Sequence, residues 1–413
     1  MQPPRMTRTP RTIELPDVVV TGVGAVTALG TGAQTLHRRW LAGEDGIAGG
    51  LARASDFDPE AGMTAKEVRR SDRYTQLAVA AAEEALAMAG WGADPPYDPF
   101  RVATMLGTGI GGIGTLESQF DVLRDSGPRR LSALGVPMMM PNAAAATIAM
   151  RRSFHGPALG TVSACAAGAN AIGTALRMLQ YGEVDAAVAG GSEAAITPYS
   201  TAAFGGMGTL SALGISRPFD ARRDGFVLGE GAGVLVLERK ADALRRGATV
   251  LAELRGYAST VDGYHLTAPD PSGAPAAAAM SLALADAGLQ PADVSYVNAH
   301  GTSTPLNDQA EAGAIRTALG PHAGSVPISS TKSAVGHLLG AAGSVEAVAT
   351  VLALHEGVAG ATLGYEEVDP LIGEDLDVIA GSPRDLPAGE RVALSNSFGF
   401  GGHNAVLCLS SEG

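Results

Sequence analysis

Short apolar runs alternate with longer segments rich in alanine and other small residues in the first half of the chain. Each run ends at a glycine or an acidic residue, as is typical of strands buried on both faces of a sheet. These predicted strands cover residues 17–22, 102–107, 184–191 and 231–238. Two segments between them predict helices: residues 71–90, with Ser71 as the N-cap and Gly90 beyond the end, and residues 168–182.

The same rhythm returns after about residue 250. Strands are predicted at residues 250–257, 294–299 and 392–396, and helices at residues 273–288, 310–319 and 340–356. Strands that alternate with helices indicate an α/β fold with largely parallel, buried sheets. We therefore expect a disordered tail at residues 1–15 and two similar halves, 16–248 and 249–413, although no repeat is visible residue by residue.

Composition narrows the class of protein. Hydrophobic residues make up 46% of the chain and charged residues 17%, which suits a large buried core. A net charge of −13 argues against nucleic acid and anionic membranes as general partners. The N-terminal segment lacks the apolar core of a secretory signal, and no apolar run is long enough to cross a bilayer. Two cysteines cannot build a disulfide framework, so we expect a cytoplasmic protein, and the Cys and His spacings predict no metal site.

Cys165 lies in the segment GTVSACAAGAN, where a strand-like stretch leads into a predicted helix. The free N–H groups and the dipole of a helix N-terminus favour a thiolate, which predicts a nucleophile. A buried, inert cysteine is the alternative reading. Cys408 lies inside the strand-like AVLCLS and is predicted to be a core residue.

Two segments contribute candidate histidines. His300 follows a predicted strand in NAHGTSTPLND, and strand ends are where ligand sites of α/β folds collect. Lys332 and His337 share the segment SSTKSAVGHLLGAAGS before a predicted helix. Each histidine is a candidate acid, base or hydrogen-bond donor. A turn-capping role for His300, or a surface position for Lys332 and His337, remains open at this point.

The segment SNSFGFGGHN, residues 395–404, follows another predicted strand. Its glycines free the backbone so that N–H groups can point at a ligand, and Phe398 and Phe400 would line an apolar site. A flexible hairpin turn is the alternative.

Taken together, these segments resemble the successive motifs of the elongating β-ketoacyl-acyl-carrier-protein synthases of type II fatty-acid synthesis. The resemblance also includes RPFDARRDGFVLGEGAGVLVLE at residues 217–238 and runs from about Val18 to Leu409. The segment GTGIGGIG, with Ile110, is similar to the ketosynthase II branch. Membership implies the thiolase fold, which is a duplicated five-layer αβαβα sandwich, and usually a homodimer.

The resemblance also implies a reaction and roles for residues. An acyl group would move from the phosphopantetheine of an acyl carrier protein to Cys165, and malonyl-carrier would lose CO₂ and attack it. His300 and His337 would donate hydrogen bonds to the developing oxyanion. The amides of Cys165 and Phe400 would form a second oxyanion hole. No metal or organic cofactor would be needed.

Further residues take supporting roles in this reading. Lys332 would order the site electrostatically with Glu346, and Glu230 would be a structural ion partner. Thr302 and Thr304 match hydroxyls that bind the pantetheine arm. Phe398 and Phe400 resemble gating phenylalanines, and Ile110 belongs to the substrate site. Candidates for a basic patch that docks the carrier are Lys66, Arg69 and Arg70, with Arg129, Arg130, Arg151 and Arg152 as further candidates.

Two departures from the family pattern stand out. The segment before RPFD, residues 204–216, is short and uncharged where relatives carry a charged insert with a docking arginine. Leu134 and Gly135 stand where some relatives have two phenylalanines near the acyl pocket of the neighbouring subunit. Smaller residues there would leave more room for an acyl chain.

Three other readings compete with fatty-acid elongation. One is a different enzyme of the superfamily, but a thiolase would need a second active cysteine near residues 399–404, and an initiating ketosynthase would have Asn in place of His337. Another is the ketosynthase of a type II polyketide system, which would form a heterodimer with a chain-length-factor subunit. The last is a non-catalytic, chain-length-factor-like subunit, which would lack the nucleophile that Cys165 provides.

Overall fold

The computed structural model describes residues 15–411, so almost all of the predicted tail lies outside the described part of the chain. Five strands of the first half form one sheet in the order β5-β4-β6-β8-β1. Strand β4 is parallel to β5 and β6, whereas β8 is antiparallel to both of its neighbours. The strands are β1 (Val18–Thr27), β4 (Val102–Gly107), β5 (Ala158–Thr161), β6 (Ala186–Glu193) and β8 (Gly231–Arg239).

The second half repeats this topology strand for strand. Its order is β11-β10-β14-β15-β9, again with two parallel pairs around the second strand and an antiparallel fourth strand. The strands are β9 (Ala252–Val261), β10 (Val294–Asn298), β11 (Ile328–Ser329), β14 (Val392–Gly399) and β15 (His403–Ser410). The halves join through β1 and β9 at the pairs Val19–Glu253 and Val20–Ala252. The duplication that no residue pattern showed is therefore plain in the topology.

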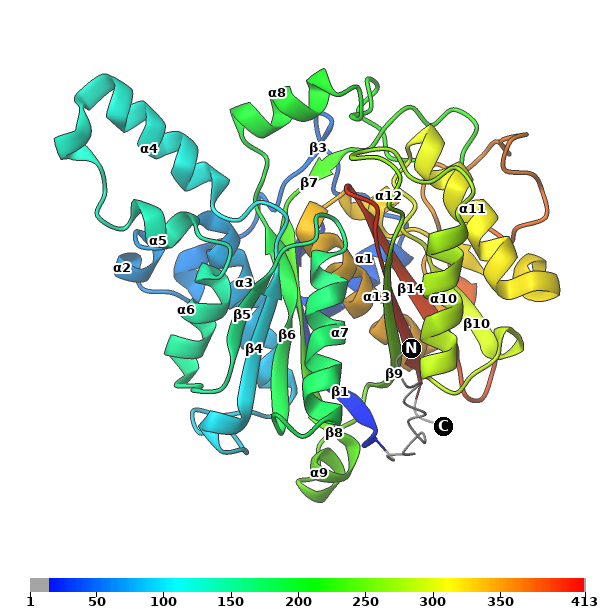
Figure 1. The fold of residues 1–413 in the computed structure, drawn as a ribbon, viewed down its shortest axis with the longest axis horizontal. Coiled ribbons are helices and arrows are strands. Elements are labelled where there is room, and N and C mark those ends of the chain that lie inside the picture. Colours follow the sequence, from blue (N-terminus) through cyan, green and yellow to red (C-terminus); the bar gives the residue numbers. More distant parts are fainter. Residues whose placement is uncertain (1–14, 412–413) are drawn as a thin grey trace, which may run out of the picture.

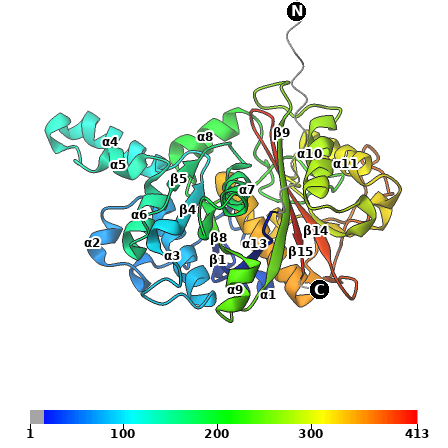
Figure 2. The same cartoon turned by 60° about the horizontal axis from the view of Figure 1, so that its bottom comes forward.

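Helices form three further layers around the two half-sheets. Figures 1 and 2 show α7 (Ala167–Gln180) and α13 (Ala342–Glu356) between the halves. One outer face carries α3 (Arg73–Met88) and α6 (Ala143–Arg152), and the other carries α10 (Ala274–Asp286) and α11 (Pro305–Leu319). Helix α13 is buried from Ala342 to Leu354, as a helix between two sheets must be. This is the five-layer α/β arrangement expected for a thiolase fold.

Small residues allow the two central helices to cross closely. A Cβ added to Gly168 of α7 would lie 2.9 Å from the backbone nitrogen of Ser344 in α13. A Cβ added to Gly343 would lie 3.0 Å from the Cβ of Ala169. The crossing brings the N-terminal ends of both helices together. Cys165 lies on the segment that leads into α7, and Lys332 and His337 lie on the segment that leads into α13.

The predicted elements are all present, but several of their boundaries differ: β1, β9 and β14 extend three to five residues beyond their predicted ends. Strand β4 covers residues 102–107 as predicted, and Gly90 follows α3 with a positive φ of 73°. The N-cap of α3 is Asp72 rather than the predicted Ser71, because the Asp72 carboxylate accepts the Tyr74 N–H at 3.2 Å. Ser71 instead donates its hydroxyl to the carbonyl of Glu67. Helix α11 begins at Pro305, five residues before the predicted start.

An arm made of α4 (Ile113–Ser126) and α5 (Gly135–Met139) projects away from the layered body in both views (Figures 1 and 2). It exposes large apolar side chains, among them Phe120 and Val136. A hollow of about 200 Å³ between its helices is lined by Gly135, whose φ is not positive. A need for a left-handed backbone therefore does not account for this glycine.

The remaining elements are short. They comprise β2 (Gly30–Thr31), α1 (Ala33–Leu41), β3 (Leu51–Ala52), α2 (Ala65–Val68), α8 (Pro198–Gly206), β7 (Leu228–Gly229), α9 (Lys240–Arg245), α12 (Lys332–Val335), β12 (Val358–Ala359) and β13 (Arg384–Asp385). Within residues 15–411, no helix combines the length and the apolar character needed to cross a membrane.

Candidate active site

Cys165 sits in a sharp turn between β5 and α7. The preceding residue, Ala164, has a φ of 49°, a left-handed conformation that residues other than glycine rarely adopt. Backbone bonds from the Ala166 and Ala167 amides, each 3.1 Å long, close the turn on Ser163 and Ala164. Such strain at a single residue persists only where the surrounding structure enforces it, and it is typical of functional sites. The turn presents Cys165 to a cavity at the start of the helix.

The two predicted histidines meet at this cysteine. His300 is separated from the end of β10 by Ala299 alone, and His337 follows α12. The His337 Nε2 atom is 3.1 Å from the Cys165 Sγ atom. The two imidazole rings have centroids 5.4 Å apart and are nearly perpendicular, at 84°. Three segments that are distant in the sequence therefore place a thiol and two imidazoles around one point.

Lys332 holds His300 from behind. Its side chain is only 1% exposed, forms an ion pair with the Glu346 carboxylate, and places Nζ 3.1 Å from His300 Nδ1. A further bond of 2.5 Å joins Nζ to the His300 carbonyl oxygen. Because an ammonium group can only donate, Nδ1 of His300 is the acceptor and the ring proton lies on Nε2.

Both imidazoles are kept neutral. Burial lowers the pKa of His300 well below its usual value, and the positive charges of Lys332 and a protonated His337 would lower it further. Burial and Lys332 do the same to the pKa of His337. A neutral imidazole can donate one N–H bond and still exchange a proton, which suits a group that stabilises a transient oxyanion.

The resting state of Cys165 differs from the expected thiolate. Burial raises the pKa of its thiol to about 11, while Lys332 and the backbone N–H of Phe400 act in the opposite direction. The carboxylates of Glu193 and Glu346 raise the pKa further. Burial therefore favours the protonated thiol at neutral pH. His337 Nε2, in contact with Sγ, is the basic atom placed to take the proton during attack.

A cavity of about 590 Å³ opens onto these groups. Its wall includes the catalytic candidates Cys165, His300 and His337 together with the predicted substrate residues Thr302, Thr304, Phe398 and Phe400. The hydroxyls of Thr302 and Thr304 lie 2.9 Å apart. A Cβ added to Gly399 would lie 2.9 Å from the Cys165 backbone nitrogen, so only glycine lets this loop approach the cysteine.

Other predicted site residues lie away from the cavity wall. Ile110 does not line it, and its amide binds the buried Glu193 carboxylate at 3.3 Å. Lys66, Arg69 and Arg70 are exposed at α2, and among the described residues none of them forms an ion pair. The further docking candidates divide: Arg129 and Arg130 are exposed on the arm, whereas Arg151 and Arg152 pair with Glu67 and Glu83. Glu230 pairs with Arg73.

Sequence reasoning missed two buried acids that shape the loop after His300. Glu311 accepts the amides of His300 at 2.8 Å and Gly301 at 2.7 Å. Asp308 accepts the amide of Thr302 at 3.0 Å. The two acids are three residues apart on α11, so they share the face that looks back at the loop. The three-residue spacing of these acids was the sequence signal that could have predicted their shared role.

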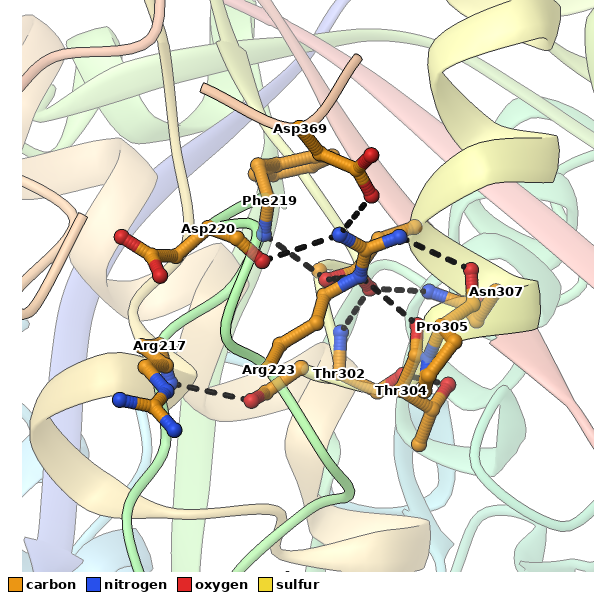
Figure 3. A network of polar contacts seen from close by, with 12 residues as sticks. Arg217, Phe219, Asp220, Arg223, Thr302, Thr304, Pro305, Asn307 and Asp369 are labelled. Carbon is orange, nitrogen blue, oxygen red and sulfur yellow. Dashed lines mark hydrogen bonds and ion pairs between the residues drawn. The ribbon is translucent and has the colours of Figure 1, made fainter. Parts of the chain in front are cut away.

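Behind this loop, Arg223 ties three segments together (Figure 3). Its guanidinium forms an ion pair with Asp369 and donates to the carbonyls of Thr304 and Pro305. Only 2% of the side chain is exposed. Because Thr304 supplies one of the cavity hydroxyls, the buried network fixes that part of the cavity wall.

Within the described residues, no group of three or more His, Cys, Asp and Glu side chains could hold a metal ion.

Comparisons with known proteins agree on a family. Residues 48–243 match the beta-ketoacyl synthase N-terminal domain, and residues 251–366 match the C-terminal domain. The chain is 46% identical to 3-oxoacyl-[acyl-carrier-protein] synthase 2 of Synechocystis, with 96% of this chain and 98% of the relative covered.

Two solved structures share its fold at full length. The ishigamide ketosynthase/chain length factor has a TM-score of 0.90 at 31% identity, with 97% of this chain and all of the other covered. A type II polyketide ketosynthase in complex with its acyl-carrier protein has a TM-score of 0.88, also at 31% identity and with the same coverage. Family matches across both halves, and a close relative covering nearly the whole chain, lead to one conclusion: this chain belongs to the β-ketoacyl synthase family.

Proposed function

We propose that this chain catalyses the decarboxylative Claisen condensation of an acyl thioester with malonyl-acyl-carrier protein, giving a 3-oxoacyl-carrier product in fatty-acid elongation. The observation that carries the proposal is the convergence of Cys165, His300 and His337 on one cavity, with 3.1 Å between Sγ and Nε2. The relatives named 3-oxoacyl-[acyl-carrier-protein] synthase 2 support the same reaction class.

The first half-reaction would load the acyl group. The Cys165 sulfur attacks the carrier thioester, forming a new C–S bond as the bond to the pantetheine sulfur breaks. His337 Nε2 receives the thiol proton and returns it to the departing pantetheine thiolate. The tetrahedral oxyanion would be held by the amides of Cys165 and Phe400, and the Phe400 N–H already points at the cysteine.

The second half-reaction would use the neutral imidazoles as donors. Malonyl-carrier loses CO₂, and the electron pair of the broken C–C bond passes to the thioester oxygen as an enolate. The Nε2–H group of His300 donates a hydrogen bond to that oxygen while charge develops, and His337 donates a second one from Nε2 in its other neutral tautomer. His337 can change tautomer because its Nδ1 atom has no hydrogen-bond partner among the described residues. The enolate carbon then attacks the acyl carbon on Cys165, and the cysteine sulfur departs as the new C–C bond forms. Lys332 acts by holding His300 in the donating tautomer.

Substrate delivery follows from the same cavity. The phosphopantetheine arm of the carrier would pass Thr302 and Thr304, and the loop with Phe398 and Phe400 would gate access to Cys165. This scheme uses no metal or organic cofactor. We further propose that the enzyme works in the cytoplasm as a homodimer and docks its acidic carrier on the basic patch formed by Lys66, Arg69 and Arg70.

Intact-mass measurement after incubation with a series of acyl-carrier thioesters tests this function. The wild-type protein is expected to gain the mass of the acyl group and to release it as a 3-oxoacyl-carrier product when malonyl-carrier is added. Cys165→Ala should prevent both steps. Cys408→Ala should permit both, because Cys408 is fully buried in β15 outside the cavity. A Cys165→Ala protein that still forms product would rule out this mechanism.

A type II polyketide ketosynthase is the second candidate. The segment at residues 204–216 is short and uncharged, and ketosynthase/chain length factor complexes are among the structural neighbours. In that case the purified chain would load an acyl group but elongate only with a chain-length-factor subunit added. Elongation by a homodimer alone, shown by size-exclusion chromatography coupled to the product assay, would favour fatty-acid synthesis.

A further inference from the structure

Glu193 is a buried carboxylate whose role the proposed reaction does not explain. It ends β6 and is fully buried, yet among the described residues no lysine or arginine forms an ion pair with it. An ionised carboxylate in such a place requires donors to replace water. It has four: the Thr108 hydroxyl at 3.1 Å and the amides of Gly109, Ile110 and Gly340 at 2.6, 3.3 and 3.0 Å.

These donors come from two segments with different places in the site. Thr108, Gly109 and Ile110 form the loop that follows β4, and Gly340 belongs to the turn that follows His337. The two segments touch: a Cβ added to Gly340 would lie 2.0 Å from the Gly109 backbone nitrogen. A Cβ added to Gly109 would lie 2.8 Å from the Glu193 carboxylate. Both glycines are therefore needed for the backbones to reach the same side chain.

The turn after His337 also carries backbone strain. Leu339, between His337 and Gly340, has a φ of 46° and lines the cavity. A left-handed leucine is costly and needs a partner that holds the next peptide in place. The bond from the Gly340 amide to Glu193 supplies that restraint.

From this geometry we propose that Glu193 is a positioning residue of the condensing reaction, which clamps the loop of residues 108–111 to the turn of residues 338–341. The clamp fixes the loop at Ile110 against the turn that follows His337, whose ring contacts Cys165. The inference rests on the proposed function for its catalytic meaning, but the clamp itself is a property of the described contacts.

The charge of Glu193 gives a second, independent readout. Burial raises the pKa of Glu193 to about 7, while its four hydrogen bonds lower it. The groups that act on the thiol of Cys165 are Lys332, which lowers its pKa, and Glu193 and Glu346, which raise it. The neighbouring His300 and His337 are neutral. Removing the charge of Glu193 should therefore make the thiol more reactive.

The variant Glu193→Gln keeps the volume of the side chain and changes only its charge and hydrogen bonds, so its effects report on the clamp and not on a cavity. One Glu193 oxygen accepts from Thr108 and Ile110, and the other accepts from Gly109 and Gly340. In Glu193→Gln the side-chain NH₂ group replaces one of these oxygens, so it must face two groups that are donors in the wild-type protein. The Thr108 hydroxyl can rotate to accept from that nitrogen, whereas the Ile110 N–H cannot. With the amide oxygen kept on the Gly109 and Gly340 amides, the variant should release Ile110 selectively.

Glu84→Gln is the matched control. Glu84 also accepts two backbone amides, those of Ala25 at 2.9 Å and Ala33 at 2.8 Å, and burial raises its pKa as well. It lies on α3 and does not line the cavity. Any effect common to both variants would report the loss of a buried carboxylate rather than the clamp.

Two measurements are made on the full-length protein. The first is the rate of Cys165 alkylation by iodoacetamide against pH, in a Cys408→Ala background. Glu193→Gln is expected to raise the rate at pH 8 by about fivefold or more and to shift the profile to lower pH, since one pKa unit changes the thiolate fraction about tenfold. The second is the intact-mass rate of acyl capture with one acyl-carrier thioester, which should fall at least about threefold, because freeing the loop at Ile110 loosens the turn that follows His337. Glu84→Gln should change neither.

The outcomes are distinct. If Glu193→Gln matches Glu84→Gln in both measurements, the clamp is wrong. If the wild-type protein captures no acyl group, the proposed function fails, while the alkylation profile still tests the effect of Glu193 on Cys165. Should Glu193→Gln fail to fold, Thr108→Val removes one donor to Glu193 and the acceptor of the Gly111 amide in the same loop, and it keeps the charge. It should reproduce the slower acyl capture without the alkylation effect, and an unchanged capture rate would equally overturn the proposal.

Discussion

The two cysteines show how much a side chain depends on its immediate surroundings. Both are buried, and burial raises the pKa of both thiols, to about 11 for Cys165 and about 12 for Cys408. Only Cys165 faces a cavity, follows a strained residue and touches an imidazole. Chemistry at the residue scale therefore comes from these contacts and not from an intrinsically acidic thiol.

The pH profile of Cys165 follows from this. Below a pKa of about 11, the thiolate fraction grows about tenfold with each pH unit. The rate of alkylation by iodoacetamide should accordingly rise with a slope near one on a logarithmic scale between pH 7 and pH 10. A plateau that begins below pH 8 would instead show a stable thiolate, as the helix N-terminus alone had led us to expect.

The histidines should separate the two half-reactions. His300→Ala removes one N–H donor to the enolate oxygen, so malonyl decarboxylation should fall by about 10² or more. Acyl capture should largely survive, because His337 and the Phe400 amide are the groups in contact with Cys165. The comparison uses single-turnover acyl loading and CO₂ release, with His322→Ala, in the surface segment Gly320–Ser325, as the control. Equal losses in both half-reactions would contradict this division.

At the scale of elements, Asp72 connects two helices. Its carboxylate caps α3 through the Tyr74 amide and also accepts the amide of Thr115 in α4 at 2.8 Å. Ser71, the cap predicted from the sequence, bonds backward to the preceding turn. One side chain therefore caps the start of α3 and anchors the base of the projecting arm.

Replacing Asp72 should destabilise the protein more than replacing Ser71. Loss of an N-cap costs about 1–2 kcal/mol in the free energy of unfolding, and Asp72→Ala also leaves the Thr115 amide without its partner. Ser71→Ala should stay within about 0.5 kcal/mol, as changes away from such features usually do. Urea denaturation of both variants makes the comparison, and equal midpoints would argue against Asp72 as the cap.

At the scale of the whole molecule, charge is distributed unevenly. The chain carries a net charge of −13, yet Lys66, Arg69 and Arg70 are exposed together at α2 without ion pairs among the described residues. Most other described arginines are engaged with nearby carboxylates, as Arg151 and Arg152 are. Unpaired positive charge on the surface attracts an acidic partner.

Reversing that patch tests whether the carrier docks there. Changing Lys66, Arg69 and Arg70 together to Glu should raise the KM for acyl-carrier protein about tenfold or more at low salt. The effect should shrink as salt rises, since exposed charges are screened over about 10 Å at 0.1 M.

A short pantetheine thioester without a carrier should be unaffected by the triple change. The control Arg245→Glu alters an exposed charge on α9, which lies away from α2 in Figure 1. Equal losses with both substrates would mean that the patch is structural.

The sequence by itself determined the features that depend on near neighbours. Apolar runs and glycines act over a few residues, so the local pattern was enough to predict several features. These are the limits of β4, the glycine that follows α3, the turn at Cys165 and the glycine-rich loop at Phe400. The family motifs also marked the cysteine and histidines as one set. For these, the local pattern contained enough information.

Only the tertiary structure decided which distant groups meet. His337 and Cys165 are 172 residues apart in the chain, and Gly340 and Glu193 are 147 apart. No period or turn signal specifies such pairs, because side-chain partners across a fold depend on how whole layers pack. That packing removes water from buried polar groups and determines which hydrogen-bond donors they can reach. It settled the choice of Asp72 over Ser71 as N-cap, the neutral state of the imidazoles and the clamp at Glu193.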